Sequence, residues 1–177
     1  MYPRVCVAVA VLVSVSLIGC GSERKLAECP SVSVLVDTGS LPVMRVPDSG
    51  NPADLVYTAQ IIDAKRDCDM PKYSKHVDAS VNIHFRAERS KPGEAASYKV
   101  PYFVAITTEG KVLAKQQFWV QFAFDQGATT ADFTDSVNSL SLTVARDKRA
   151  AEYGIIVGFQ LTKSQLAFNR KVGRYAP

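Results

Sequence analysis

The chain has 177 residues, of which 47% are hydrophobic and 21% are charged, and its formal net charge is +4. This composition is too apolar for a disordered chain, and the length suits a single domain. Basic residues gather only in short groups at 146–149 and 170–174, which argues against a nucleic-acid-binding groove. We interpret both groups as solvated turns, with weak attraction to anionic lipid headgroups or cell-wall polymers as the alternative.

The first 20 residues have the organisation of a secretion signal. Arg4 precedes an apolar run over residues 5–18, and the small residue Gly19 follows it. The run is shorter than the about 20 residues that a membrane-spanning helix needs. We therefore predict a signal peptide at residues 1–19, and the alternative of a permanent spanning segment is the weaker one.

The end of this segment, Leu17-Ile18-Gly19-Cys20, resembles the lipobox of bacterial lipoproteins. The resemblance implies that Cys20 is acylated, with palmitate or similar chains, and becomes the first residue of the mature protein. The acyl chains fix the protein to a membrane. We predict no cofactor. Gly21 and Ser22 follow the cysteine where inner-membrane lipoproteins of this family tend to carry Asp, so the resemblance favours the periplasmic face of the outer membrane. The alternative is an ordinary signal peptide with an incidental cysteine.

Two of the four cysteines remain once the signal peptide is removed and Cys20 is acylated. These are Cys29 and Cys68, and an oxidising periplasm permits a disulfide between them. The competing interpretation is a metal or redox pair. Neither cysteine lies in a Cys-x-x-Cys spacing or near a histidine in the sequence, so we predict the structural bridge.

Residues 20–28 are polar and suit a lipidated tether, and residues 29–177 are predicted to form one domain. Apolar runs with a period of two, separated by turn residues, are typical of β-strands. Strands are predicted at residues 31–36, 55–68, 76–88, 98–107, 112–124, 137–144 and 153–161. Residues 41–51 contain Pro42 and Pro47, which favours an irregular edge segment or a loop.

The connections carry signals of their own. Thr108-Glu109-Gly110 predicts a tight hairpin, and residues 127–134 have the composition of a polar loop. Thr162 and Gln165 fit a capping box that opens a short carboxy-terminal helix. An apolar stripe on that helix is expected at Leu166, Ala167 and Val172.

About seven strands separated by turns favour an antiparallel sandwich of the immunoglobulin or fibronectin type III kind, with a small closed barrel as the alternative. The stretches 100–124 and 153–170 resemble a group of uncharacterised proteobacterial outer-membrane lipoproteins. That resemblance supports lipoprotein status and implies no activity.

Residue types that carry chemistry are sparse in the predicted mature chain. Its two histidines, His76 and His84, share one face of a predicted strand but stand about 26 Å apart if that strand is straight, too far to share a metal. Asp125, Asp132 and Asp135 surround the predicted polar loop but lack the spacing of a calcium-binding loop. No pattern of a serine hydrolase or of a phosphate-binding loop occurs. We therefore predict no enzyme activity and no metal site.

Recognition is what remains, and one residue stands out. If Phe118, Val120, Phe122 and Phe124 face the core, Trp119 falls on the opposite face of its strand, between Gln117 and Gln121. With Tyr102 or Phe103 nearby, these residues would form an aromatic platform for a partner protein or a glycan.

The alternative, which we favour at this point, is that residues 41–51 or the terminal helix cover Trp119. The function expected from the sequence is a lipid-anchored, non-enzymatic structural or protein-interaction module of the cell envelope, with an envelope protein as partner. Binding of a small ligand, glycan or peptidoglycan fragment is the alternative.

Overall fold

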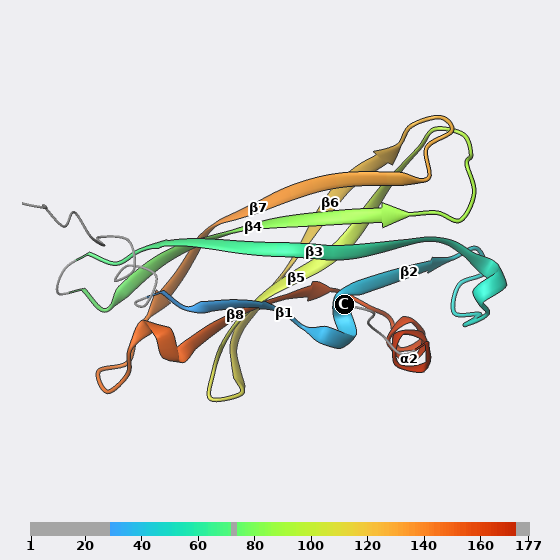
Figure 1. Cartoon of the computed structure of the whole chain (residues 1–177). Coiled ribbons are helices and arrows are strands. Elements are labelled where there is room, and N and C mark those ends of the chain that lie inside the picture. The colour runs from blue at the N-terminus through green and yellow to red at the C-terminus, as the bar shows by residue number, and fades with distance from the viewer. Residues whose placement is uncertain (1–28, 72–73, 173–177) are drawn as a thin grey trace, which may run out of the picture.

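The computed structural model describes residues 29–71 and 74–172. The predicted signal peptide, Cys20 and the tether at 20–28 lie outside the described residues, as do the last five residues of the predicted domain. Within the described ranges the fold is mainly β, with eight strands in two layers and one α-helix, α2 (Lys163–Lys171) (Figure 1). The predicted sandwich architecture is confirmed, with one more strand than expected.

Each layer is a four-stranded sheet. Sheet A has the order β1-β8-β5-β6, and sheet B has the order β2-β3-β4-β7. All neighbouring strands are antiparallel except β1 and β8, which run parallel. The strands are β1 Ser31–Val34, β2 Ser40–Met44, β3 Leu55–Asp69, β4 His76–Glu88, β5 Ala96–Thr108, β6 Lys111–Phe124, β7 Thr130–Thr143 and β8 Tyr153–Phe159.

The core lies between the two sheets and is built by alternation. Every second residue of β4, from Val77 to Ala87, is buried, while the residues between them are polar and face outward. Phe85 of β4 forms ring contacts with Tyr102 of β5, Phe133 of β7 and Phe159 of β8, so it joins both sheets. These contacts place the apolar face of each strand inward, and the outward faces are left for recognition.

One buried polar contact crosses the core. The Tyr102 hydroxyl donates to Oδ2 of Asp135 at 2.8 Å, and Asp135 lies on the inward side of β7. Burial, together with this hydrogen bond, raises the pKa of Tyr102. The pair therefore fixes how β5 faces β7 while satisfying a hydroxyl that burial would otherwise leave without a partner.

The β5–β6 hairpin is formed as predicted. Glu109 and Gly110 both have positive φ, 50° and 73°, and connect Thr108 to Lys111 in a two-residue turn. Such a turn matches the twist of the flanking strands, and glycine is favoured there because it has no Cβ to clash. The hairpin sets which face of β6 carries each residue.

Several predicted strand bounds differ from those in the structure, and the largest difference is at the start of β7. Residues 127–134, predicted as a loop, instead begin strand β7 at Thr130, because polar Thr130, Asp132 and Thr134 alternate with inward-facing Ala131 and Phe133. The polar residues of this amphipathic strand have the same composition as a turn, which explains the difference. The first strand ends at Val34 rather than residue 36, since the chain turns into the short helix η1 (Val36–Thr38).

The segment at 41–51 contains the edge strand β2, which pairs with β3, and a loop that leads to η2 (Pro52–Asp54). The edge part of that expectation is confirmed. Pro42 is accepted in β2 because an edge strand has a neighbour on one side only.

Helix α2 is confirmed, including its capping box between Thr162 and Gln165. The expected apolar stripe of Leu166, Ala167 and Val172 is wrong, because Ala167 and Val172 are exposed. The helix docks through amide groups instead. Asn169 Nδ2 donates to the carbonyls of Asp37 and Ser40, and Gln165 Nε2 donates to the carbonyl of Pro42.

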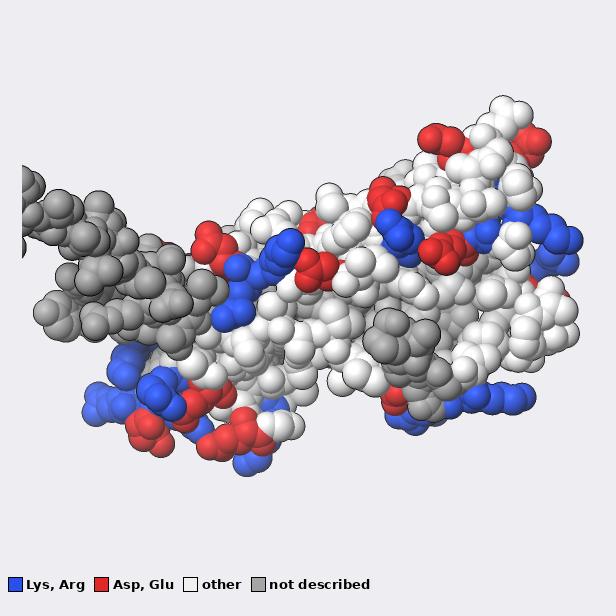
Figure 2. Space-filling model, viewed as in Figure 1, with Lys and Arg blue, Asp and Glu red and all other residues white. Residues whose placement is uncertain are grey.

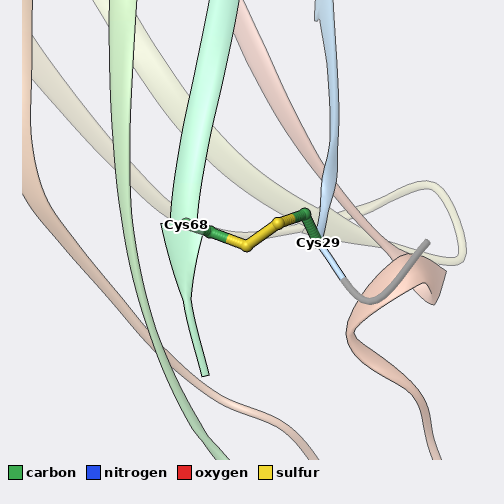
Figure 3. Close-up of a disulfide and its surroundings, with 2 residues drawn as sticks. All are labelled: Cys29 and Cys68. Carbon is green, nitrogen blue, oxygen red and sulfur yellow. A yellow bond between two sulfur atoms is a disulfide. The ribbon is translucent and has the colours of Figure 1, made fainter. Parts of the chain in front are cut away.

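The predicted disulfide between Cys29 and Cys68 is present, with Cα atoms 6.1 Å apart, and links the chain two residues before β1 to the end of β3 (Figure 3). It therefore ties sheet A to sheet B. By strand register, the Cys29 end of the sandwich also holds the end of β7, the start of β8 and the β5–β6 turn.

The bridge gives the first prediction. Replacing Cys29 and Cys68 by Ala should lower the free energy of unfolding by about 4 kcal/mol, because the 39-residue separation no longer restricts the unfolded chain. Denaturant unfolding of the two forms measures the difference. The double variant should also be insensitive to added reductant, unlike the parent protein, and equal stability of parent and variant would contradict the structural role.

Candidate functional site

The outward face of the β5–β6 hairpin carries the most prominent exposed aromatic side chain. Trp119 of β6 is 51% exposed and stands directly across from Pro101 of β5. Lys99, two residues before Pro101, places its Nζ 5.6 Å from the centre of the indole ring. A cation at that distance is attracted to the ring face, so Trp119 is held as a platform with a positive rim.

Gln117 and Gln121 flank Trp119 on the same face, as the alternation predicted. Gln117 stands across from Phe103 of β5, whose ring lies under the Lys115 ammonium at 4.1 Å. Phe103 is thus the predicted neighbour that shares this face. Tyr102, the other predicted neighbour, is not, because it points into the core and pairs with Asp135.

The expectation that another segment covers Trp119 was wrong. Helix α2 packs against β2 and η1, and β2 lies at the far edge of sheet B. Neither segment shields the indole, which accounts for its exposure. A half-exposed tryptophan keeps enough free surface to bind a partner, so the platform interpretation is the one that the geometry supports.

Two further apolar side chains extend this face toward the hairpin turn. Val112 and Leu113 are 61% and 54% exposed, and all residues of β6 from Lys111 to Gln117 are exposed whichever face they occupy. We call the exposed part of this hairpin the β6 surface. It comprises Lys99, Val112, Leu113, Lys115, Gln117, Trp119 and Gln121.

Val112, Leu113, Lys99 and Lys115 are members of the β6 surface that the sequence does not predict. Val112 and Leu113 lie in the predicted strand 112–124. In the structure a register shift between Ile106 and Thr107 interrupts the alternation there, so the period of two does not give their faces. Lys99 could have been found, since the hairpin register places it opposite Gln121, beside Trp119.

Charge separates the two sheets. The four strands of sheet A contain no acidic residue, whereas β3, β4 and β7 of sheet B contain seven, namely Asp63, Asp67, Asp69, Asp78, Glu88, Asp132 and Asp135. Figure 2 shows acidic and basic side chains interspersed over the part of the surface that β3 and β4 form. The β6 surface is thus cationic and apolar without acidic neighbours in its own strands.

The outward face of sheet B brings a serine, a histidine and an aspartate together. Ser141 Oγ lies 2.8 Å from Nε2 of His76, and Asp78 Oδ1 lies 3.3 Å from the same nitrogen. In a catalytic triad the carboxylate orients the ring through the other nitrogen, Nδ1, so that Nε2 can take the serine proton. Here both partners compete for one nitrogen on an exposed sheet face, an arrangement suited to surface hydrogen bonding.

The second histidine, His84, belongs to a separate ion pair. Its Nε2 lies 3.3 Å from Asp132 Oδ1, and Arg86 donates from Nε to the same carboxylate at 2.9 Å. The Arg86 hydrogen bond, with a smaller contribution from His84, lowers the pKa of Asp132 below its usual value. Each histidine therefore interacts with its own carboxylate.

The carboxylates grouped in the sequence do not converge. Asp132 points outward from β7, Asp135 points inward to Tyr102, and Asp125 lies in the loop before β7. Asp67 and Asp69, which flank Cys68, lie on the outward face of β3, where Asp69 stands opposite Asp78. Among the described residues, no group of three or more His, Cys, Asp or Glu side chains is placed to hold a metal ion.

The best-defined hollow lies between the loop after β2 and helix α2. It has a volume of about 200 Å³ and is lined by Val43, Met44, Pro47, Asp48, Gly50, Thr162, Ser164, Gln165 and Phe168. The Asp48 carboxylate, at the N-terminus of helix α2, accepts hydrogen bonds from the hydroxyl groups of Thr162 and Ser164. The Asp48 carboxylate therefore connects the loop to the first turn of the helix. Ser164 has a structural role there, as a hydrogen-bond donor at the start of the helix.

Comparison with known proteins identifies no relative. The chain matches no protein family, no curated protein and no solved structure. In the described part of the chain, no helix has the length and apolar character required to span a bilayer.

The Asp132 ion pair gives the second prediction. Arg86→Gln should raise the pKa of Asp132 toward its ordinary value, because the guanidinium hydrogen bond is the main cause of the lowered value. Since the folded pKa is the lower one, the stabilising effect is present above the unfolded pKa and is lost as pH falls through the folded pKa, in the range below about pH 4. A carboxyl NMR titration measures the shift.

The matched control for this titration is His84→Gln, which should move the Asp132 midpoint less than Arg86→Gln does. An Asp132 midpoint that is the same in the parent and the Arg86 variant would contradict the assignment.

Proposed function

We propose that this protein is a lipid-anchored module of the bacterial cell envelope that binds a protein partner through the β6 surface and catalyses no reaction. The anchor rests on the lipobox-like Leu17-Ile18-Gly19-Cys20, and the placement at the periplasmic face of the outer membrane rests on Gly21 and Ser22. The observation that carries the binding role is the half-exposed Trp119 on a hairpin whose neighbouring strands contain no acidic residue.

Several properties of the β6 surface suit a protein contact. Aromatic residues are enriched at the centres of protein interfaces, and Trp119 is surrounded by the amides of Gln117 and Gln121 and by lysine stems. The surface continues along a sheet edge, since β6 has a hydrogen-bonded neighbour on one side only. An exposed edge and an adjacent apolar face together offer both main-chain and side-chain contacts.

The same geometry supports the non-enzymatic part of this proposal. Within the described residues, both histidines lie on the open outward face of sheet B. In the hollow beside helix α2, the carboxylate of Asp48 is already engaged in intramolecular hydrogen bonds. A catalytic site needs titratable groups that converge in a cleft. Recognition is therefore the role that we propose.

A second candidate is binding of a glycan or a peptidoglycan fragment. It is favoured by one observation, the side-by-side placement of Trp119, Gln117 and Lys99, because an indole face stacks on sugar rings while amides and ammonium groups bind their hydroxyls and carboxylates. Muropeptide or polysaccharide pulldown with purified protein would favour this candidate if binding is lost in the Trp119 variant.

The finer fold assignment is also a proposal. Two packed, largely antiparallel four-stranded sheets are compatible with the immunoglobulin and fibronectin type III style of sandwich. The parallel pairing of β1 with β8 departs from the purely antiparallel sandwich that the sequence predicts.

The anchor gives the third prediction. Cys20→Ala should move the protein from the membrane fraction to the soluble fraction. Two or three acyl chains make membrane attachment effectively permanent, and alanine at this position cannot be acylated. Fractionation of cells expressing each form measures the shift. Cys6→Ala is the matched control and should leave the protein in the membrane pellet, whereas an unchanged membrane fraction for the Cys20 variant would refute the anchor.

The platform gives the fourth prediction. Trp119→Ala should abolish crosslinking to the envelope partner in intact cells while lowering stability by only about 1–2 kcal/mol, less than the about 3–5 kcal/mol expected for a buried tryptophan. Crosslinking followed by pulldown through a tag measures binding, and denaturant unfolding measures stability.

The control for Trp119 is Ile62→Ala, since Ile62 is also exposed but lies in β3, in the other sheet. This variant should keep the partner. Retention of the partner in both variants would move the interaction to another face.

A further inference from the structure

Four strands form the edges of the two sheets, and three of them are protected against pairing with another chain. Strand β1 has only four residues, and β2 contains Pro42 together with a register shift. Strand β7 has a register shift opposite β4, with Ser139 at a φ of 70°. Short length, proline and irregular backbone are the devices by which proteins prevent edge-to-edge pairing.

Strand β6 lacks this protection over most of its length. It has 14 residues, and its register with β5 shifts only next to the hairpin turn, so Ala114–Phe124 pairs without interruption. Val112 and Leu113, at the start of this edge, expose apolar side chains to solvent. A long, regular and partly apolar edge is the kind that accepts an added strand.

The two halves of β6 differ in how the other sheet covers them. Lys111–Gln117 is exposed on both faces, while Val120, Phe122 and Phe124 are buried on the inward face, where Phe122 stacks on Phe133 of β7 at 4.4 Å. The change from uncovered to covered falls at Gln117 and Phe118. The uncovered half, Lys111–Gln117, would be protected by a partner strand with the opposite distribution. Such a strand is covered by its own second sheet where it lies beside Lys111–Gln117, and uncovered where it lies beside Val120–Phe124.

We propose that a second copy of this chain supplies that strand, with β6 pairing antiparallel to β6 of the partner about a two-fold axis at Gln117. In this register the open half of each copy lies beside the covered half of the other, so each β7 overhangs the partner's uncovered segment. Sheet A of the two copies then becomes one continuous eight-stranded sheet.

Cross-strand side-chain pairs favour this register over an axis at Leu113 or at Lys115. Pairing about Gln117 places Lys115 opposite the partner's Trp119, a cation beside an aromatic ring, and Lys111 opposite the partner's Ala123. An axis at Leu113 would set Lys111 against the partner's Lys115, and an axis at Lys115 would set that residue against itself. Like charges directly opposite each other destabilise strand pairs, which disfavours both alternatives.

This pairing deepens the proposed function and rests on the part of it that makes the β6 surface a protein contact; it does not depend on the lipid anchor. The two can fail separately. A different partner that needs Trp119 would leave the proposed function standing while the self-pairing is refuted.

Single cysteines placed along β6 test the pairing in the full-length protein. Gln117→Cys lies on the axis, so the two thiols would face each other within the Cα separation of about 4.4–6.8 Å that a disulfide needs. Gln121→Cys, equally exposed on the same face, would stand about 27 Å from its copy in the partner. After mild oxidation of intact cells, the Gln117 variant should give at least about tenfold more disulfide-linked dimer than the Gln121 variant on a non-reducing gel.

The double variant Leu113→Cys with Gln121→Cys gives an independent measure, because Leu113 pairs with the partner's Gln121 in the proposed register. It should form the dimer where the Gln121 variant alone does not. Equal dimer yields from the Gln117 and Gln121 variants would indicate random collision and overturn the proposal. Absence of dimer from the Gln117 variant, or its crosslinking to a different protein, would overturn it as well.

Discussion

Aromatic packing between the two sheets is the interaction on which the rest of the structure depends. Phe85 contacts rings from β5, β7 and β8, and Phe122 stacks on Phe133 across the sandwich. Because these contacts bury one face of each strand, they also decide which residues face outward. Trp119 is exposed for this reason, since its neighbours Phe118 and Val120 on the strand are the ones that point to sheet B. The binding surface follows from how the core is packed.

The regular parts of this fold were predictable, because alternation alone determines them. The bounds of β4 agree with the sequence pattern to the residue, and the β5–β6 turn follows from Glu109 and Gly110. The start of β7 was missed, since its outward residues are Thr130, Asp132 and Thr134, which are equally common in loops. Strand and loop differ there only in what Ala131 and Phe133 contact, and a tertiary contact has no signature in a local pattern.

The site was predictable in part for the same reason. The face of Trp119 and its glutamine neighbours follows from a period of two, whereas its exposure depends on where α2 lies. Helix α2 docks through the side-chain amides of Gln165 and Asn169, which bind carbonyl groups near β2 rather than an apolar stripe. A search for an apolar stripe therefore does not find the face through which the helix docks, and so does not show that Trp119 is left exposed. Polar docking of this kind is fixed by the geometry of carbonyl groups, which becomes visible only in the folded chain.

The unequal distribution of carboxylates has a consequence for orientation. All the acidic residues within the strands belong to sheet B, while sheet A presents Lys99 and Lys115 on its outward face. Charge within the strands is therefore separated between the two layers, with the positive side on the outward face of sheet A. Near an anionic surface such a body experiences a torque that turns the cationic layer toward that surface, at distances within about 8–10 Å at physiological ionic strength.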